Sequence, residues 1–197
     1  MSAGLERILA FATEIARLET VERRTRPPGL GRHESSAEHS WHACMLAMLL
    51  AGEAREPIDV GRVLEILLVH DIPEIDCGDQ IAYAVRSADR HAAERAGAAR
   101  LFGMLPEAAA RRWASRWEEL EERATAEARF AHAIDRLCPV LLNLASNGQS
   151  WRENAIPVER VKELNRAIGE ALPGVWAHVE AAIDRLHAAE PLGPEGR

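Results

Sequence analysis

The stretch VLEILLVHDIPEIDCGD, residues 63–79, decides most of what this sequence predicts. Its first seven residues are apolar on nearly every helical face apart from one glutamate, which is typical of a helix that is buried on several sides. His70 and Asp71 follow directly, and His70 continues the apolar stripe of this helix. Pro73 and Gly78 then break the helical pattern, so we expect the acidic residues after Asp71 to lie around a turn.

The rest of the chain also has helical periodicity and lacks the alternating pattern of strands. Ser35 and Glu38 have the spacing of a capping box, which predicts a sharp helix start. We expect helices over residues 5–16, 35–54, 57–69, 88–102, 106–123, 125–146, 157–169 and 173–189. A loop rich in arginine, proline and glycine should connect the first two helices across residues 20–34. The sequence therefore predicts a single all-α domain over residues 1–190 and a flexible tail over 191–197.

Length and composition limit the class of protein. The 197 residues, 47% hydrophobic and 28% charged, suffice for one globular domain with a substantial core. A net charge of −7 argues against a nucleic acid polymer or an anionic membrane as partner. We find no apolar run of the roughly 18 residues that span a bilayer and no signal peptide. The three cysteines lie far apart and fit a reducing compartment, so we expect a cytoplasmic protein.

Polar side chains on helix faces that should be buried indicate a functional site, because burying them unpaired is unfavourable. His39 lies in line with apolar residues of the second helix, and Asp135 does so in a later helix. His70 and Asp71 end the third helix. One divalent cation would satisfy all four, and this set of nitrogen and oxygen donors suits Mn, Fe, Co, Ni, Zn or Mg. Ordinary interpretations stay open, since a core histidine can bond backbone, Asp135 can pair with an arginine, and His42 shares the face of His39.

The turn after the His-Asp pair carries three further carboxylates, Glu74, Asp76 and Asp79. Water that is activated by a metal needs a nearby carboxylate to orient it and to take its proton, and Glu74 is well placed for this role. The alternative is a solvated acidic loop, which we prefer for Asp76 but not for Glu74 or Asp79.

Three ordered motifs, ESSAEHSWH, LLVHDIPEIDCGD and EARFAHAIDRL, begin at Glu34, Leu67 and Glu127. Together they resemble the HD-domain metal-dependent phosphohydrolases and, more narrowly, the 5′-deoxynucleotidase branch of that superfamily. The resemblance extends over about residues 5–150. It implies an HD-domain helical bundle with a metal site at its centre, and it implies a homodimer.

The resemblance also implies roles for individual residues. The family's ligands to a single metal correspond to His39, His70, Asp71 and Asp135. Its carboxylate for the nucleophilic water corresponds to Glu74, and its sugar-binding aspartate corresponds to Asp79. A family arginine that binds the substrate near its phosphate matches Arg24 best, with Arg23 one register away. An aromatic residue follows that arginine in the branch members with the best-defined substrates, whereas Thr25 follows Arg24 here, so the base and sugar preference stays open.

On this resemblance we expect a metal-dependent 5′-nucleotidase that acts on ribo- or deoxyribonucleoside 5′-monophosphates. Its cofactor would be one divalent ion (Mn, Co, Fe, Ni, Zn or Mg), and its partner would be a small-molecule nucleotide. Two alternatives stay open: an HD phosphohydrolase or phosphodiesterase acting on another nucleotide or phosphate ester, and a non-catalytic nucleotide sensor. The complete ligand set together with Glu74 argues against the sensor, because a sensor has no need of a carboxylate that handles water.

Overall fold

The structure, a computed structural model, describes residues 2–81, 83 and 87–193. It is 73% helical, with no strand in the described part of the chain, which confirms the predicted all-α class. In chain order the elements, with 3-10 turns written η, are α1 (Ala3–Ile15), η1 (Ala16–Thr20), α2 (Ser36–Leu50), η2 (Ala51–Glu53), α3 (Val60–Val69), α4 (Glu74–Cys77), α5 (Ala88–Gly103), α6 (Glu107–Glu122), α7 (Ala126–Ala145), α8 (Gln149–Glu153), α9 (Val158–Asn165), α10 (Ala167–Ala171) and α11 (Pro173–Ala189). None of the described helices is long and apolar enough to cross a membrane.

Each helix that the periodicity predicts is present, with small shifts at its ends. The segment expected as one helix over 157–169 is divided at Arg166 into α9 and α10. Two short helices, α4 and α8, lie where the periodicity predicts none. Helices of four or five residues are too short to show a period, so pattern alone does not reveal them.

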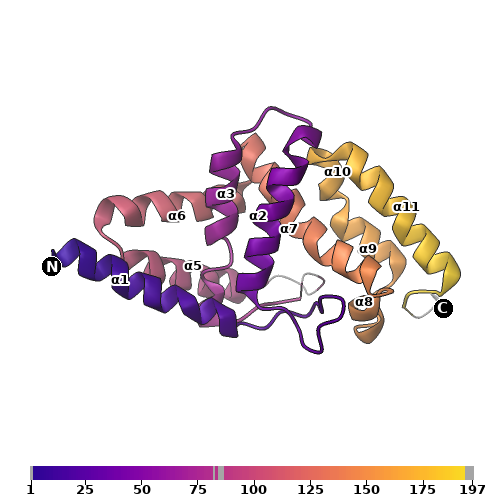
Figure 1. The fold of residues 1–197 in the computed structure, drawn as a ribbon, viewed down its shortest axis with the longest axis horizontal. Coiled ribbons are helices and arrows are strands. Elements are labelled where there is room, and N and C mark those ends of the chain that lie inside the picture. Colours follow the sequence, from indigo (N-terminus) through magenta and orange to yellow (C-terminus); the bar gives the residue numbers. More distant parts are fainter. Residues whose placement is uncertain (1, 82, 84–86, 194–197) are drawn as a thin grey trace.

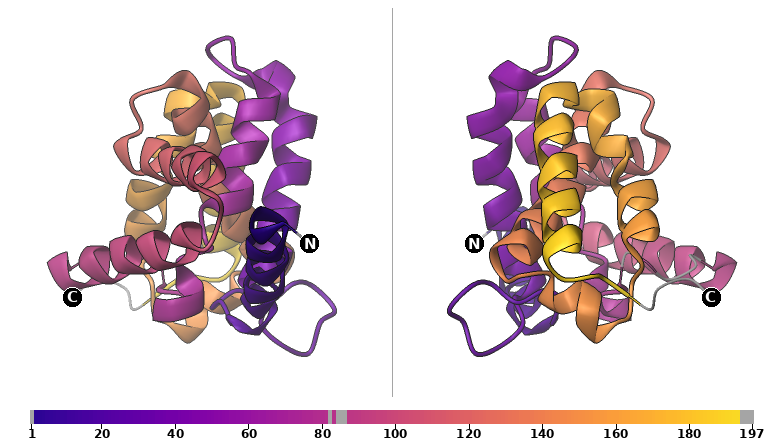
Figure 2. Two further views of the ribbon diagram at one scale, coloured as in Figure 1. Left: turned by 90° about the vertical axis from the view of Figure 1, so that its left-hand side faces the viewer. Right: turned by 90° about the vertical axis from the view of Figure 1, so that its right-hand side faces the viewer.

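The central helices form the frame of the molecule. α2 and α3 lie side by side, and α7 packs against both (Figure 1). α1, α5 and α6 lie at one end of this frame, and α8 to α11 lie at the other. At that second end α11 packs on α9 and α10, as the turned views show (Figure 2). The three motifs therefore fall on the helices that the rest of the chain surrounds.

Capping side chains determine where the central helices begin. The Ser35 hydroxyl accepts a hydrogen bond from the Glu38 backbone N–H (3.2 Å), and the Glu38 carboxylate accepts one from the Ser35 N–H (2.8 Å). This is the predicted capping box. Asp59 and Thr125 cap α3 and α7 through their side-chain oxygens. Each motif helix thus starts at a defined residue. A fixed start also fixes which side of the helix carries the polar motif residues.

Two apolar clusters hold the frame. The larger one joins α2, α3 and α7 to the C-terminal helices and includes the fully buried Ile66 and Ile134. The smaller one joins the end of α3 and α4 to α5 through Val69, Ile75 and Phe102. Because α3 contributes to both clusters, its C-terminal end, where the His-Asp pair lies, is held from two sides.

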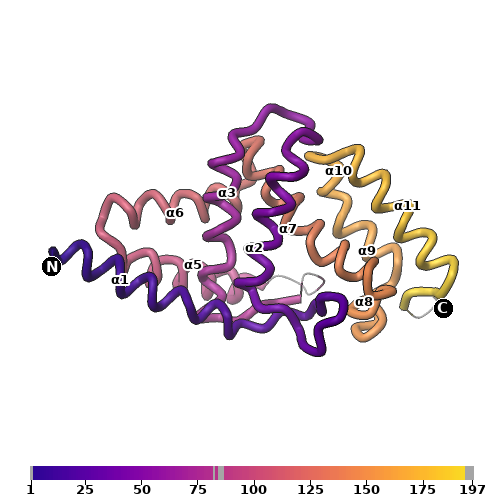
Figure 3. Tube along the Cα trace, viewed as in Figure 1, coloured from indigo at the N-terminus to yellow at the C-terminus, as the bar shows by residue number. Residues whose placement is uncertain are grey.

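The connection between η1 and α2 is the expected irregular loop, and it runs past the lower end of α2 (Figure 3). Its two ends pair through backbone hydrogen bonds, from Arg23 N–H to the Glu34 carbonyl (2.9 Å) and from Glu34 N–H to the Thr25 carbonyl (3.0 Å). Side chains alternate along such extended backbone. Thr25 is accordingly buried and Arg24 exposed, while Arg23 faces the interior with Thr25.

The first residues of the expected flexible tail are packed against the rest of the chain. Leu192 is only 2% exposed and belongs to the larger apolar cluster. The Arg152 guanidinium donates to the Pro191 carbonyl (2.9 Å), and the Leu192 N–H donates to His187 Nδ1 (3.0 Å). Burial of Leu192 therefore holds in place residues that their proline and glycine content predicts to be flexible. The rest of the expected tail, residues 194–197, lies outside the described residues.

Candidate metal centre

Three helices bring the four expected ligand residues together. The fully buried His39, in the first turn of α2, has its Nε2 3.0 Å from Asp135 Oδ1 on α7. His70, at the end of α3, has its Nε2 3.1 Å from Asp71 Oδ1 and 3.5 Å from Asp135 Oδ1. Asp71 Oδ2 lies 4.0 Å from His39 Nε2. These side chains converge on one point at the centre of the bundle.

The donor set fits one divalent cation. His70 Nδ1 lies 2.7 Å from the Leu67 carbonyl and donates its hydrogen there, which leaves the lone pair of Nε2 directed at the cluster. That Nε2 atom is buried and has no hydrogen-bond partner among the described residues. Two bonds of about 2.1 Å to one ion place their donor atoms about 3 Å apart at right angles and about 4.2 Å apart when opposite. The separations of 3.0 to 4.0 Å in this cluster lie in that range.

The electrostatics of the cluster agree with a site for a cation. Burial, assisted by the charge of Arg23, lowers the pKa of His39 to about 4, so this imidazole is neutral at pH 7. Burial also lowers the pKa of His70, but Asp71 and Asp135 outweigh it and raise that pKa to about 9. Burial raises the pKa of Asp135, yet the two neighbouring histidines, His39 and His70, hold it well below its usual range. A proton on His70 and a bound cation are thus alternative sources of the positive charge that these carboxylates require.

Glu74 lies next to the cluster at the start of α4. Its Oε2 accepts a 2.7 Å hydrogen bond from the hydroxyl of Ser36, the first residue of α2. Burial and the negative charge of Asp71 raise the pKa of Glu74 well above its usual range. A raised pKa suits a carboxylate that takes a proton from water near neutral pH. Sequence reasoning misses Ser36, because capping alone accounts for a serine at a helix start.

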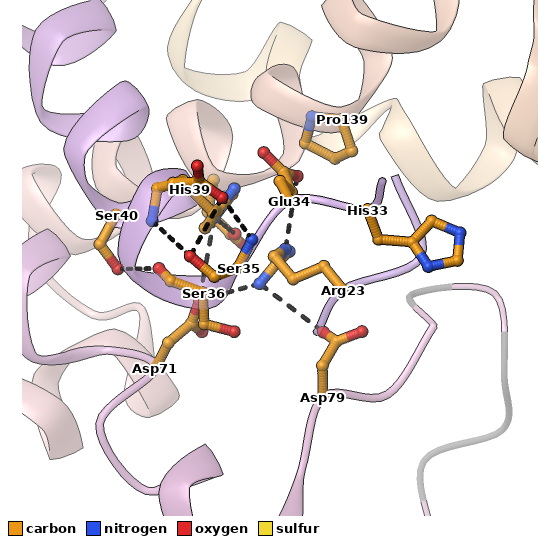
Figure 4. Close-up of polar contacts among 12 residues, drawn as sticks. Arg23, His33, Glu34, Ser35, Ser36, His39, Ser40, Asp71, Asp79 and Pro139 are labelled. Atoms are coloured by element: carbon orange, nitrogen blue, oxygen red, sulfur yellow. Dashed lines mark hydrogen bonds and ion pairs between the residues drawn. The ribbon is translucent and has the colours of Figure 1, made fainter. Parts of the chain in front are cut away.

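Arg23, and not Arg24, lies beside the cluster (Figure 4). The Arg23 Nη1 donates a 2.8 Å hydrogen bond to Asp71 Oδ2 and lies 3.6 Å from Asp79 Oδ1. Arg24 is exposed, on the other side of the paired loop. The structure thus brings Arg23, one position before the expected Arg24, to the cluster and leaves Arg24 away from it. The two registers match the motif almost equally well, and only the backbone pairing of the loop decides between them.

Two further carboxylates flank Arg23. Glu34, which sequence reasoning leaves unassigned, has a side chain only 2% exposed, with Oε1 3.7 Å from Arg23 Nε. Neither of these two atoms has a hydrogen-bond partner among the described residues. Burial raises the pKa of Glu34 to about 7, although Arg23 opposes the change. Asp79, the expected sugar contact, is also buried, and burial raises its pKa as well.

A cavity of about 200 Å³ adjoins the cluster. Its walls include three of the four ligand residues together with Glu74, Asp79 and Arg23. α7 contributes Arg136 and Pro139 to the same walls. A small molecule in this cavity would therefore contact the cluster, the buried glutamate and at least one arginine at once.

Comparison with known proteins identifies the family. The family model for the HD domain matches residues 15–176, which is most of the chain. This chain belongs to the HD-domain family, and the resemblance of its three motifs to that family is confirmed. The fold is accordingly an HD-domain helical fold.

Solved structures agree with this assignment. A protein from Magnetospirillum magnetotacticum MS-1, described as a predicted metal-dependent phosphohydrolase, has a TM-score of 0.91 and 38% identity, covering 98% of this chain and 100% of that one. A protein from Pyrococcus horikoshii OT3 has a TM-score of 0.65 and 20% identity, covering 88% and 99%. An HD-domain phosphohydrolase from Listeria innocua has a TM-score of 0.56 and 17% identity, covering 93% and 86%. At these lower identities the likeness shows the fold alone.

Among characterised sequences, a dATP triphosphohydrolase of Salmonella phage PMBT28 is 39% identical over 56 residues. The match covers 24% of this chain and 29% of the phage protein, so this chain spans under a third of that relative's length.

Proposed function

We propose that this protein is a metal-dependent phosphohydrolase that removes phosphate from ribo- or deoxyribonucleoside 5′-monophosphates. The observation that carries the proposal is the cluster of His39, His70 and Asp135, with the Asp71 carboxylate 3.1 Å from His70 Nε2, beside a cavity that a buried glutamate and an arginine also line. The 38% identity to the Magnetospirillum protein supports the reaction class. The choice of nucleoside monophosphates rests on the motif resemblance.

One divalent ion would be held by His39, His70, Asp71 and Asp135. Such an ion, when bound, supplies Lewis acidity toward a phosphate oxygen and makes water easier to deprotonate. The donor set suits Mn, Co, Fe, Ni, Zn or Mg. The imidazole of His39, whose pKa is about 4, is available as a ligand without first losing a proton.

Glu74 would orient the attacking water and take its proton as the oxygen attacks phosphorus in line with the leaving oxygen. The Ser36 hydroxyl fixes one carboxylate oxygen of Glu74 at 2.7 Å, and the other oxygen would contact the water. The ester bond breaks on the far side of phosphorus, the leaving nucleoside oxygen takes a proton from solvent, and Glu74 returns to solvent the proton that it accepted. The products are a nucleoside and inorganic phosphate.

Arg23 would neutralise charge on the phosphate through its planar set of donors. It is held against Asp71 at 2.8 Å, which links the position of the guanidinium to a metal ligand. Asp79, 3.6 Å from the same guanidinium nitrogen, would accept a hydrogen bond from the sugar. Arg24 has no part in this proposal.

The test is a panel of ribo- and deoxyribonucleoside 5′-monophosphates, each assayed for phosphate release with each of the six metals. Turnover of monophosphates that is lost in the Asp71→Ala variant, together with its metal, supports the proposal. Full activity of that variant with metal still bound would contradict the ligand assignment. Absence of turnover on every monophosphate would contradict the proposed function and would revive the sensor.

A second candidate is hydrolysis of nucleoside triphosphates. The observation that favours it is the 56-residue match to the phage dATP triphosphohydrolase. Parallel assays on a nucleoside monophosphate and on dATP separate the two candidates, because the first candidate predicts phosphate release from the monophosphate and the second predicts hydrolysis of dATP.

We also propose a homodimer and a cytoplasmic location. Apolar side chains on the outer face of α2 recur at helical spacing and are exposed: Trp41, Met45, Met48 and Leu49. An uncovered apolar stripe of this kind supports an interface with a second copy. Light scattering should give twice the chain mass of 21.7 kDa, and a mass equal to one chain would contradict the dimer.

Three free cysteines support the proposed cytoplasmic location, which cell fractionation tests.

A further inference from the structure

Arg136 is one of the arginines that line the cavity beside the metal cluster. It follows the ligand residue Asp135 on α7 and lines the same cavity of about 200 Å³ as the metal cluster. Sequence reasoning leaves it without a role, since an arginine beside an aspartate is usually half of a surface ion pair.

The surroundings of Arg136 differ from those of a surface arginine. Its Nε and Nη1 atoms are buried, and neither has a hydrogen-bond partner among the described residues. Arg136 as a whole is half-buried, but enclosed N–H donors without a partner are unfavourable, so folded proteins seldom keep two of them in one side chain for structural reasons. Its retention beside the cluster points to a partner that is not part of the chain.

The other arginines of the cavity are already engaged. Arg23 donates to Asp71 at 2.8 Å. Arg90 donates to Glu94 at 2.8 Å and to the carbonyls of Cys77 and Gly78. Arg123 is exposed at the C-terminal end of α6. Arg23 also has an unpartnered Nε, but its Nη1 is engaged by Asp71, whereas two donor atoms of Arg136 are enclosed without a partner among the described residues.

We propose that Arg136 binds an oxyanion in this cavity, and that the oxyanion is the phosphate of the substrate. A planar guanidinium donates two parallel hydrogen bonds to phosphate oxygens, and the match is best where water is excluded. The identification of the anion as substrate phosphate rests on the proposed function, whereas the anion site itself does not.

The site can be tested with inorganic phosphate as the probe, on the full-length protein as purified, with the metal content of each variant measured. Phosphate should raise the melting temperature of the wild type. Arg136→Met should weaken phosphate binding about tenfold or more, and Arg136→Lys should fall between them because it keeps the charge but loses the paired donors. The control is Arg111→Met, at an exposed arginine of α6 that pairs with Glu107 away from the cavity, which should bind phosphate as the wild type does.

A second readout separates ligand binding from a structural role. Without phosphate, Arg136→Met should melt at the same temperature as the wild type or higher, because it removes two enclosed donors that have no partner. A lower melting temperature with unchanged phosphate affinity would overturn the proposal, as would a wild type that binds no phosphate.

Kinetics distinguish this site from the proposed function. On any monophosphate that is turned over, Arg136→Met should raise KM about tenfold or more at unchanged metal content. Turnover with an unchanged KM would refute the role of Arg136 and leave the function standing. Phosphate binding that depends on Arg136, in a protein without phosphatase activity, would support the anion site and refute the function.

Discussion

Arg23 and Arg24 are neighbours in the chain, yet their side chains have opposite surroundings. Backbone bonds between Arg23, Thr25 and Glu34 make the loop locally extended, so successive side chains point to opposite sides. Arg23 is thereby enclosed with Asp71, while Arg24 faces solvent. A difference of one residue in register decides which arginine can reach the site.

The role of Glu74 can be separated from metal binding at the scale of this residue. Glu74→Gln keeps the size of the side chain but cannot accept a proton from water. We expect kcat to fall about 10²- to 10⁴-fold with metal content unchanged, as removal of a general base does. Ser36→Ala, which removes the 2.7 Å hydrogen bond to Glu74, should cause a smaller loss. Wild-type kcat in Glu74→Gln would show that another group handles the water.

Glu34 makes stability depend on pH. Burial raises its pKa from about 4.5 to about 7, so between these pH values the folded chain keeps a proton that the unfolded chain has lost. Stability from this group is therefore greatest at low pH and falls as pH rises toward 7. Glu34→Gln lacks this titration, so its free energy of unfolding should equal that of the wild type near pH 4.5 and exceed it by up to about 3 kcal/mol above pH 7.

Urea unfolding of both proteins from pH 4.5 to 8 measures this difference. Two curves that stay parallel across the range would show that Glu34 has an ordinary pKa in the folded chain.

At the scale of elements, the position of α4 depends on one glycine of α5. A Cβ on Gly97 would lie 2.9 Å from the carbonyl oxygen of Pro73, which directly precedes Glu74. This carbonyl oxygen is part of the backbone, so it cannot move aside as the end of a flexible side chain can. Gly97→Ala should therefore displace the segment that carries Glu74, lower the free energy of unfolding by about 1–3 kcal/mol and reduce kcat.

Gly103, at the end of the same helix, provides the matched control. A Cβ there would meet nothing within 4 Å, so Gly103→Ala should be neutral or stabilising by up to about 1 kcal/mol, with activity unchanged. If both variants unfold and turn over alike, close packing of α5 on Pro73 has no influence on the site.

At the scale of the whole molecule, the metal site joins helices that are far apart in the sequence. α2, α3 and α7 each supply at least one of the residues His39, His70, Asp71 and Asp135. An ion bound only by the folded chain stabilises it by about 2.7 kcal/mol when present at 100 times its dissociation constant. Removing the metal with a chelator should therefore lower the melting temperature, and adding it back should restore it.

Calorimetry with and without chelator measures the effect, and Asp71→Ala serves as the control in which the chelator should change little. Identical melting of the wild type in both conditions would mean that no ion is held by this cluster.

The sequence by itself determined the positions of the longer helices and the capping box at Ser35, because these features are local or periodic and a helix contacts its own residues three and four positions away. Periodicity left His39 and His42 as alternatives, and the resemblance of the motifs to a known family chose the four residues that converge. The tertiary structure alone decided that Arg23 turns inward, that Ser36 bonds Glu74, that Arg136 is enclosed without a partner and that Leu192 is buried. Each of these four features arises where segments from distant parts of the chain pack together. A local sequence pattern therefore does not predict which side chains that packing buries.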